Sequence, residues 1–490
     1  MSTRWGLFAF FLIFLFFPYG ILLSKFSLAL QLDVPELWWA FKNSTLQALM
    51  SSVGSFFAGL FLLLGFFQVQ RASFYRLWMT RPLEVLLLLP NFLPPLFILL
   101  VLLSLVQPFP TGIPGVVLVH IMMNAGLVAL LLKSLIENKL RPLVEAAYME
   151  GSGQWRFFQA SFGMLRRDLF AIFLFVFILC FCSFSVPLIA GGGKATTLEI
   201  LIYEKIRISG AWGEALSLSF IQMLLILLLS SVPFQARKNL FSSQNPLPML
   251  KSRVGMVLLF LYCFGLIFYF LSQSLKGWLQ VFAVQGLWQA ALELLPFSLM
   301  FGLSVGGLVA FLLLLTAWGA PDEKLHRLIS GMVSPSTALM GFSLLFFISN
   351  ESPWVEIKWA LGFAYLIFST LYRWGWDQKL SGLRDQIQVA NLLGASRHLI
   401  FTDILLPQLL NPLAWIASVA SLWALGDFAL GKIVMGRDAS LSLLIETLMS
   451  SYRLPAAHAL MGLLLVMGCL CFLFFWGIAY VSRRALAEKI

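Results

Sequence analysis

The sequence predicts an all-α integral membrane protein with about twelve transmembrane helices, arranged as two parallel six-helix repeats. Three observations lead to this prediction. The chain has 490 residues, of which 60% are hydrophobic and 11% charged, with a mean hydropathy of +0.90. Long apolar runs recur at the length of a membrane span, and the two halves of the chain resemble each other at a constant offset.

The low charge content excludes an ordinary soluble domain, in which roughly 25% of residues are charged. A hydrocarbon core about 30 Å thick requires about 20 apolar residues in a helix, and backbone groups in lipid must bond internally. Runs such as WGLFAFFLIFLFF do not alternate polar and apolar residues as the strands of a membrane barrel do. Helical spans are expected over residues 5–29, 46–70, 83–107, 112–133, 167–190, 213–234, 252–275, 288–316, 327–349, 354–372, 408–430 and 457–481.

The distribution of basic residues predicts the orientation. With the N-terminus in the cytoplasm, 23 of the 33 Lys and Arg residues fall in cytoplasmic segments. Both termini are therefore expected to be cytoplasmic. The N-terminal run is too long, and too poor in small residues, for a cleaved signal peptide, so it is expected to be the first retained span. The net charge of +11 thus reflects topology, and no nucleic acid is expected as a partner.

Catalytic and metal-binding patterns are not found in the sequence. The five cysteines lie in apolar runs, and no His or carboxylate cluster accompanies them, so neither disulfides nor a metal site is expected. The GGGK stretch at Gly191 lacks the spacing of a phosphate-binding loop. We therefore expect no catalytic residue and no cofactor bound by this chain.

Polar and proline residues within the spans carry further expectations. Asn91 and Asn124 should bond across helices, or kink the third span together with three prolines. These prolines are Pro90, Pro94 and Pro95. Glu84 and Glu293 lie near span ends and are expected to reach water.

An internal repeat divides the chain into residues 1–240 and 241–490, joined by a polar stretch rich in Ser, Asn, Pro and basic residues. VEAAYMEGSG in the cytoplasmic loop 133–166 aligns with IQVANLLGAS in the loop 373–407, with Glu145 matched to Gln388. The same offset aligns TLEILIYEKI with SLSLLIETLM without a gap across the intervening span. Since both loops face the cytoplasm, the repeats are parallel.

The aligned loop segments have helical spacing. Val144, Ala147, Tyr148 and Gly151 occupy one face at i, i+3, i+4 and i+7, and the second copy repeats this spacing. Such a stripe often serves only to pack a helix on its neighbours. The small residues and the flanking basic residues instead favour a short helix that inserts into a groove of a cytoplasmic partner.

These segments resemble the EAA loop of the permease subunits of bacterial ABC importers, which forms a coupling helix that docks on an ATPase. The first copy has Glu145, Ala146, Ala147 and Gly151, but no LP pair downstream. The second copy keeps Ala390, Gly394 and an LP pair at Pro407, whereas Gln388 and Val389 replace the motif's Glu and Ala. The two expected docking sites are therefore not equivalent.

The resemblance extends over both halves and is closest to the fused iron(III) and thiamine branch of these importers. The stretches 180–206 and 423–434 resemble the end of the fifth span and the outer loop of that branch. The GGGKATT pattern from Gly191 and the SYR at Ser451–Arg453 favour thiamine over iron(III). The resemblance implies inward transport of a small cationic solute across the bacterial inner membrane. It implies two copies of a cytoplasmic ABC ATPase that bind ATP and Mg, and a periplasmic or extracellular solute-binding protein.

A second candidate site lies where the fifth span of each half ends. Asp427 stands in an apolar stretch, where an acid costs about 2.5–3.5 kcal/mol at the helix centre. It is either hydrated at the outer interface or functional. Ser183 and Phe184 occupy the corresponding place in the first half, and Phe428 follows Asp427. These four residues are expected to line the translocation path or its outer gate.

Two other classes of function remain open from the residues alone. An ion-coupled secondary transporter could also have two six-helix halves, but the segment QVQRASFYRLWMTRP lacks the glycine and acid typical of the loop between its second and third spans. A membrane scaffold could use the paired loops to bind another partner. The paired loops at one constant offset favour the importer.

Overall fold

The computed structural model describes residues 2–29, 33–71, 80–230, 251–319, 329, 336–347, 351, 353–435 and 439–487. The expected boundary between the repeats, at residue 240, lies outside these residues. The described part of the chain forms helices and connecting turns and contains no strand, which confirms the predicted all-α class.

The described residues of the first half form ten α-helices and one π-helix. They are α1 (Ser2–Lys25), α2 (Val34–Arg71), α3 (Thr80–Phe92), α4 (Pro95–Leu105), α5 (Ile113–Leu135), η1 (Ile136–Leu140), α6 (Arg141–Met149), α7 (Gln154–Phe181), α8 (Ser185–Ala190), α9 (Leu198–Arg207) and α10 (Trp212–Ser230).

The second half begins at α11, and its described helices follow in the same general order. They are α11 (Arg253–Phe260), η2 (Leu261–Gly265), α12 (Leu266–Ala283), α13 (Leu287–Trp318), α15 (Thr337–Phe347), α16 (Trp354–Leu371), η3 (Tyr372–Trp376), α17 (Asp377–Gly382), α18 (Arg384–Leu392), α19 (Arg397–Leu399), η4 (Ile400–Leu405), α20 (Leu406–Leu425), α21 (Ala429–Val434), α22 (Leu441–Ser450) and α23 (Leu454–Ala487).

Membrane-spanning capacity is clear for most of these helices. Within the described residues, seven helices are long and apolar enough to cross a bilayer, and two bent helix pairs raise the number to nine. The three other expected spans coincide with α7, α15 and α16, which do not meet the same criteria. The chain is thus a multi-pass membrane protein, while the number of twelve spans stays a prediction.

The third expected span is kinked, as predicted. The helices α3 and α4 meet at an angle of 92°, and Pro94 and Pro95 stand at the break. Asn91 donates a hydrogen bond to the Asn124 side chain on α5, at 3.3 Å, which confirms the expected bond across helices. The Asn91 side chain also donates to the backbone carbonyl of Met123 on α5, at 3.4 Å, so α3 and α5 are joined by polar contacts beside the break.

The chain forms two compact units that interleave in sequence. Unit 1 comprises residues 1–32, 201–227 and 277–490, and unit 2 comprises residues 33–200 and 228–276. Hence α1 belongs to the unit built mainly from the second half, and α11 to the unit built mainly from the first half. The two exchange points, after residues 32 and 276, lie almost one repeat offset apart. Hydrophobicity alone did not predict this exchange, because it locates spans but not their neighbours.

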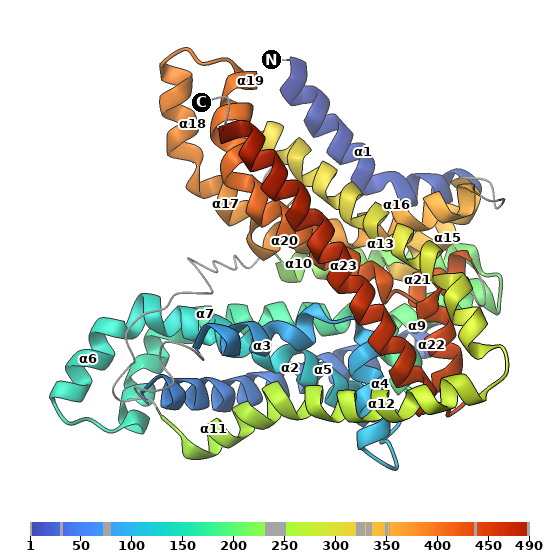
Figure 1. Cartoon of the computed structure of the whole chain (residues 1–490), viewed down its shortest axis with the longest axis horizontal. Helices are drawn as coiled ribbons and strands as arrows, with labels where there is room; N and C mark the ends of the chain where they lie inside the picture. The colour runs from blue at the N-terminus through green and yellow to red at the C-terminus, as the bar shows by residue number, and fades with distance from the viewer. Residues whose placement is uncertain are drawn as a thin grey trace. The chain divides into compact units, whose positions relative to one another are not determined.

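Unit 2 is organised around α2 and α5, which pack along each other, with α3, α7 and α11 beside them (Figure 1). Glycines allow the closest approaches. Gly65 on α2 faces the backbone of Gly255 on α11, and Gly126 on α5 faces the carbonyl of Leu87 on α3. The amide of Gly126 also donates to Tyr262 Oη at 3.2 Å. Membrane helices lack a hydrophobic driving force for association, so such close backbone packing is a main source of stability.

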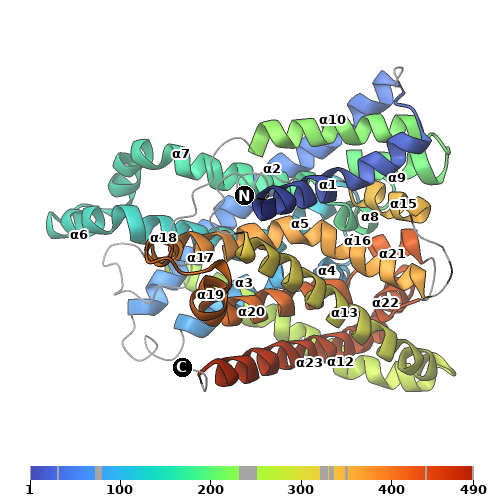
Figure 2. The ribbon, with the colours of Figure 1, turned by 90° about the horizontal axis from the view of Figure 1, so that it is seen from above.

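Unit 1 has the long helices α13, α20 and α23 side by side (Figures 1 and 2). Gly306 on α13 lies against Ser421 and Ala417 of α20. The helix α1 joins this unit through Tyr19 and Leu22, which form a buried cluster with Leu216 and Leu339. Small residues and aromatic contacts therefore hold both long and short helices of this unit.

Matching elements recur at the predicted offset. The helices α9 and α22 both have ten residues, and their first residues, Leu198 and Leu441, are paired by the repeat alignment. In unit 2 the Ser44 hydroxyl accepts the amide of Leu198 at 2.8 Å, and in unit 1 the Ser298 hydroxyl accepts the amide of Leu441 at 3.0 Å. These pairs support the two-repeat interpretation, although the division of the chain at residue 240 stays a prediction.

Replacement of Gly126 tests the packing of unit 2. Gly126→Val places a side chain against the backbone of Leu87, so we expect a loss of about 1–3 kcal/mol in stability. The matched control is Gly265→Val, because Gly265 has no neighbour within 4 Å. Thermal unfolding in detergent should show a lower Tm for the first variant only. Equal Tm values for both variants would contradict this packing.

Candidate functional site

Two short helices, one in each unit, correspond in length and position. The helix α6 runs from Arg141 to Met149, and α18 runs from Arg384 to Leu392, so each has nine residues. Their first residues, Arg141 and Arg384, are paired by the repeat alignment. Figure 1 shows α6 at one end of its unit, beyond α7, and α18 at one end of its own unit, beside α17 and α19. Both predicted coupling segments are therefore helices at the periphery of a unit.

The same glycine cap ends both helices. Gly151 has φ of 70° and Gly394 has φ of 78°, which is the left-handed region that side chains with a Cβ avoid. The amide of Gly151 bonds to Tyr148 O and that of Ser152 to Ala147 O, at 3.1 and 2.9 Å. The amides of Gly394 and Ala395 bond to Asn391 O and Ala390 O, at 3.1 and 3.0 Å. This pattern closes a helix with a sharp reversal of the chain.

Each helix buries one face in its own unit. Val144 and Ile387, which correspond in the two copies, are fully buried, and Ala390 is buried as well. Val144 and Ala390 thus pack within their own units, and the role of the predicted stripe in binding a partner stays a prediction. Packing of the helix on its own unit accounts for these residues. The pattern of apolar residues in the sequence could not show which face of each helix packs against its own unit.

The outward faces carry the remaining predicted residues and several large apolar side chains. Glu145, Ala146 and Gln388 are exposed, and Arg141 donates to the Glu145 carboxylate at 3.2 Å. Met149 and Leu392 occupy equivalent positions, and each is 87% exposed. Leu393 is exposed as well, next to the capping glycine. Exposed apolar side chains at a tight turn are typical of an interaction surface.

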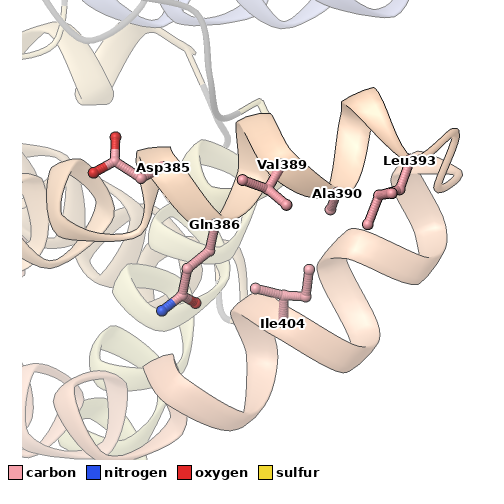
Figure 3. A pocket seen from close by; sticks show the side chains of 6 residues that line it. All are labelled: Asp385, Gln386, Val389, Ala390, Leu393 and Ile404. Carbon is pink, nitrogen blue, oxygen red and sulfur yellow. The ribbon is translucent and has the colours of Figure 1, made fainter.

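A groove lies beside α18 in unit 1 (Figure 3). It has a volume of about 430 Å³. Its lining residues are Asp385, Gln386, Val389, Ala390, Leu393 and Ile404. Val389 and Leu393 extend from α18 toward Ile404 on η4, so the groove floor is apolar, with one acid at its end (Figure 3).

Pro407 gives the second loop a geometry that the first loop lacks. It stands in the first turn of α20, directly after the π-helix η4. Because proline has no amide hydrogen, it cannot continue the preceding helical bonding, and the helix type changes there. Met164 occupies the corresponding position of the first copy, and α7 continues through it from Gln154 to Phe181. The two loops therefore differ in shape as well as in sequence.

The second group of predicted residues lies at two matching helix breaks. The spans expected at 167–190 and 408–430 are each interrupted, between α7 and α8 and between α20 and α21. Phe184 and Phe428 stand at the starts of α8 and α21 and are buried, while Ser183 is half-buried. The structure thus places these residues at equivalent breaks in their own units.

Asp427 has partners on three helices of unit 1. Its carboxylate accepts hydrogen bonds from Trp359 Nε1 at 2.8 Å and from the amides of Leu430 and Gly431 at 3.2 and 3.3 Å. Its backbone carbonyl accepts the Ser442 hydroxyl at 2.7 Å. Asp427 therefore caps α21 and links it to α16 and α22. Sequence reasoning missed Trp359, since no local pattern connects an indole on α16 to an acid several helices further along the chain.

Unit 2 contains a buried polar network at its own break, which sequence reasoning also missed. Gln47 on α2 donates to the carbonyl of Cys180, in the last turn of α7, at 2.8 Å. The Gln47 carbonyl oxygen lies 3.1 Å from His120 Nδ1 on α5. Asn124 donates to the backbone of His120 at 2.9 Å. Polar residues spaced by a helical turn along α2 were the available signal.

Glu84 departs from its expectation, whereas Glu293 is exposed as expected. Glu84 is buried and pairs with Lys133 on α5, so the prediction that it reaches water is wrong. Its position near the end of a span suggested solvent, but the facing helix presents a cation instead. The described residues also bear on metal binding, because metal ligands are recognised by residue type. Within these residues, no group of three or more His, Cys, Asp or Glu side chains could hold a metal ion.

Parts of this chain are similar to known transport proteins. Residues 383–486, from α18 to the end of α23, match the family of binding-protein-dependent transport system inner membrane components. The thiamine transport system permease protein ThiP of Escherichia coli is 28% identical over 47% of this chain and 45% of its own length. The ThiP proteins of Salmonella typhimurium and Brucella suis are 31% and 35% identical, over 39% and 25% of this chain and 38% and 23% of their own lengths.

The matched stretches span less than half the length of each of these relatives. No solved structure matches the chain significantly. These similarities fit the structure, which is an all-helical membrane fold. The helix α18 lies at the start of the segment that matches the family. The similarity of this chain to the family of binding-protein-dependent transport system inner membrane components is found over residues 383–486.

Proposed function

We propose that this chain is the permease subunit of an ABC importer that moves a small cationic solute inward across the bacterial inner membrane. The observation that carries the proposal is the pair α6 and α18. Each is a nine-residue helix with a left-handed glycine cap and a large apolar side chain exposed at the same position. A repeated peripheral helix of this kind suits a protein that binds two copies of one partner.

The partner is a cytoplasmic ABC ATPase in two copies, one on each coupling helix. The sequence contains no phosphate-binding loop, so ATP and Mg are bound by the ATPase. At α6 the contact would be made by Glu145, Ala146, Ala147 and the turn at Gly151. At α18 it would be made by Gln388, the turn at Gly394 and the groove, whose shape depends on Pro407. The groove adds apolar surface to the docking site at α18.

Thiamine is the favoured solute, because several relatives are thiamine transport system permease proteins. Iron(III) is the second candidate, since it is also cationic. A solute-binding protein on the outer side delivers the solute to the outer loops, which cover residues 191–213 and 432–455. Both termini are then cytoplasmic. The whole mechanism is alternating access, in which the two repeats rock as ATP closes the ATPase pair.

Ser183, Phe184, Asp427 and Phe428 are proposed to shape the translocation path. They lie at equivalent helix breaks, and breaks within spans occur where the backbone lines a cavity or a protein interior. Within this arrangement Asp427 caps the start of α21, since its carboxylate accepts hydrogen bonds from the amide of Leu430 and from Trp359. It would hold α21 in place beside the path, and the neighbouring Phe428 would contribute the apolar wall.

Replacement of the capping glycines tests the coupling assignment. Gly151→Val and Gly394→Val require valine at positive φ, which costs about 1–2 kcal/mol and distorts the turn. Co-expression with the neighbouring ATPase should then give several-fold less copurified ATPase for each variant and less still for the double variant. The larger loss is expected for Gly394→Val.

The matched control for this experiment is Gly153→Val. Gly153 has φ of −76° and no neighbour within 4 Å, so valine fits there without strain. It should leave ATPase copurification unchanged. If Gly151→Val and Gly394→Val keep both copurification and uptake, the coupling assignment is wrong. If no ATPase copurifies with the unmodified chain, an ion-coupled secondary transporter becomes the better interpretation.

Substitution of Asp427 separates its structural task from a role in the path. Asp427→Ala removes the acceptor of three hydrogen bonds, so we expect a loss of about 1.5–3 kcal/mol and a clearly lower Tm in detergent. Asp427→Asn keeps one acceptor oxygen and should lose less. Uptake by Asp427→Asn should remain within about threefold of the unmodified chain. An unchanged Tm together with abolished uptake in Asp427→Ala would contradict the capping role.

A further inference from the structure

A buried ionic cluster lies in unit 2, outside the two sites already described. Lys133, near the end of α5, pairs with Glu84 on α3 and approaches Glu137 on η1 at 3.8 Å. The three side chains are 1%, 3% and 4% exposed. The Lys133 ammonium also lies 5.1 Å from the centre of the Phe66 ring on α2. One cation thus connects the end of α5 to α2 and α3.

The cluster is placed at the joint that leads to the first coupling helix. The elements α5, η1 and α6 follow one another without a gap from Ile113 to Met149. Lys133 stands in the last turn of α5, and Glu137 stands in the π-helix between α5 and α6. A displacement of α6 therefore acts directly, without an intervening loop, on the helix that carries this cluster, whereas a turn separates α6 from α7.

Stability alone gives a weak reason for such a cluster. Removing two charges from water costs more than an exposed pair gains, and apolar replacements of a buried pair are often equally stable. A buried pair does, however, fix the relative position of its two helices, because separation of the partners leaves a charge without compensation in a region of low dielectric constant. The cluster is thus suited to hold α3 and α5 in one register while they move.

At the corresponding position in unit 1, a different kind of contact links the helix to its neighbour. The repeat alignment pairs Lys133 with Trp376, which ends the π-helix η3. The Trp376 Nε1 donates to the Thr316 hydroxyl on α13 at 2.8 Å, and both residues are buried. The same joint therefore carries an ionic tie in unit 2 and a neutral hydrogen bond in unit 1.

We propose that Lys133 and Glu84 are positioning residues that transmit the displacement of α6 to α3 and α2 during transport. This inference rests on the proposed function, since it requires α6 to be moved by the ATPase. Lys133 keeps the end of α5 fixed to α3, so the two helices move with α6 as one body. Unit 1 transmits through a neutral bond, so the two ATPase copies act on differently tied halves.

The test uses the full complex with its ATPase and solute-binding protein, reconstituted in lipid nanodiscs. The main variant is Glu84→Gln with Lys133→Met, which removes both charges and leaves no unpaired ammonium. Spin labels at Val85 on α3 and Leu143 on α6, both exposed, report the distance between these helices. The measurements are copurified ATPase, hydrolysis stimulated by the binding protein, and the width of the label distance distribution.

The double variant should copurify as much ATPase as the unmodified chain, with stimulated hydrolysis lowered about three- to tenfold and a broadened distance distribution. The charge exchange Glu84→Lys with Lys133→Glu, made together with Glu137→Gln so that the carboxylate introduced at position 133 does not face a second acid, should restore at least half of the stimulation. Unchanged stimulation and an unchanged width in the double variant would overturn the proposal. If the double variant does not accumulate, the exchange variant decides: a folded exchange variant without stimulation also overturns it.

The matched control is Thr316→Val, which removes the neutral tie in unit 1. It should leave the Val85–Leu143 distribution unchanged, and an equal broadening would show general loosening and overturn the proposal. The proposed function is judged separately, by copurification of ATPase with the unmodified chain. If that copurification succeeds while the double variant couples normally, only the inference about Lys133 and Glu84 fails.

Discussion

The rest of the structure depends on one constraint, namely that polar groups placed in a bilayer must find partners within the protein. This constraint makes every described span helical, and it also decides where helices can stop. At the breaks after α7 and α20, side chains satisfy the freed backbone groups: Gln47 from α2 in unit 2, and in unit 1 Asp427, which stands in the break itself, together with Ser442 from α22. The break geometry is shared, while the chemistry that satisfies it differs between the units.

This difference shows how a duplicated architecture can acquire unequal halves. In unit 2 the core beside the break is polar, with Gln47, His120 and Asn124 joined by hydrogen bonds. In unit 1 the ring of Trp359 lies 4.1 Å from that of Phe301, and its indole N–H reaches Asp427. The two coupling loops diverge in the same way, since a proline stands in the first turn of α20, whereas α7 runs unbroken through the corresponding position. An importer with two identical ATPase copies would then be driven through two unequal contacts.

Much of this arrangement could be predicted from the sequence. Apolar length located every described span, the prolines at 94 and 95 predicted the kink, and the constant offset predicted that α6 and α18 would match. The glycines were informative because positive φ is a local backbone property. The sequence could not show that α1 and α11 exchange units, since hydrophobicity carries no information on which helix is a neighbour. It also misjudged Glu84, because burial of an acid depends on a cation that another helix supplies.

The central claim is that α6 and α18 contact a cytoplasmic ATPase, and site-specific crosslinking tests it most directly. Met149→Cys and Leu392→Cys place a thiol at the two equivalent exposed positions, and Leu279→Cys supplies an exposed position away from both helices. The account predicts that a bifunctional reagent links the chain to the co-expressed ATPase through both of the first two positions and not through the third. Absence of crosslinks at Met149→Cys and Leu392→Cys, with the ATPase present in the same membranes, would contradict it.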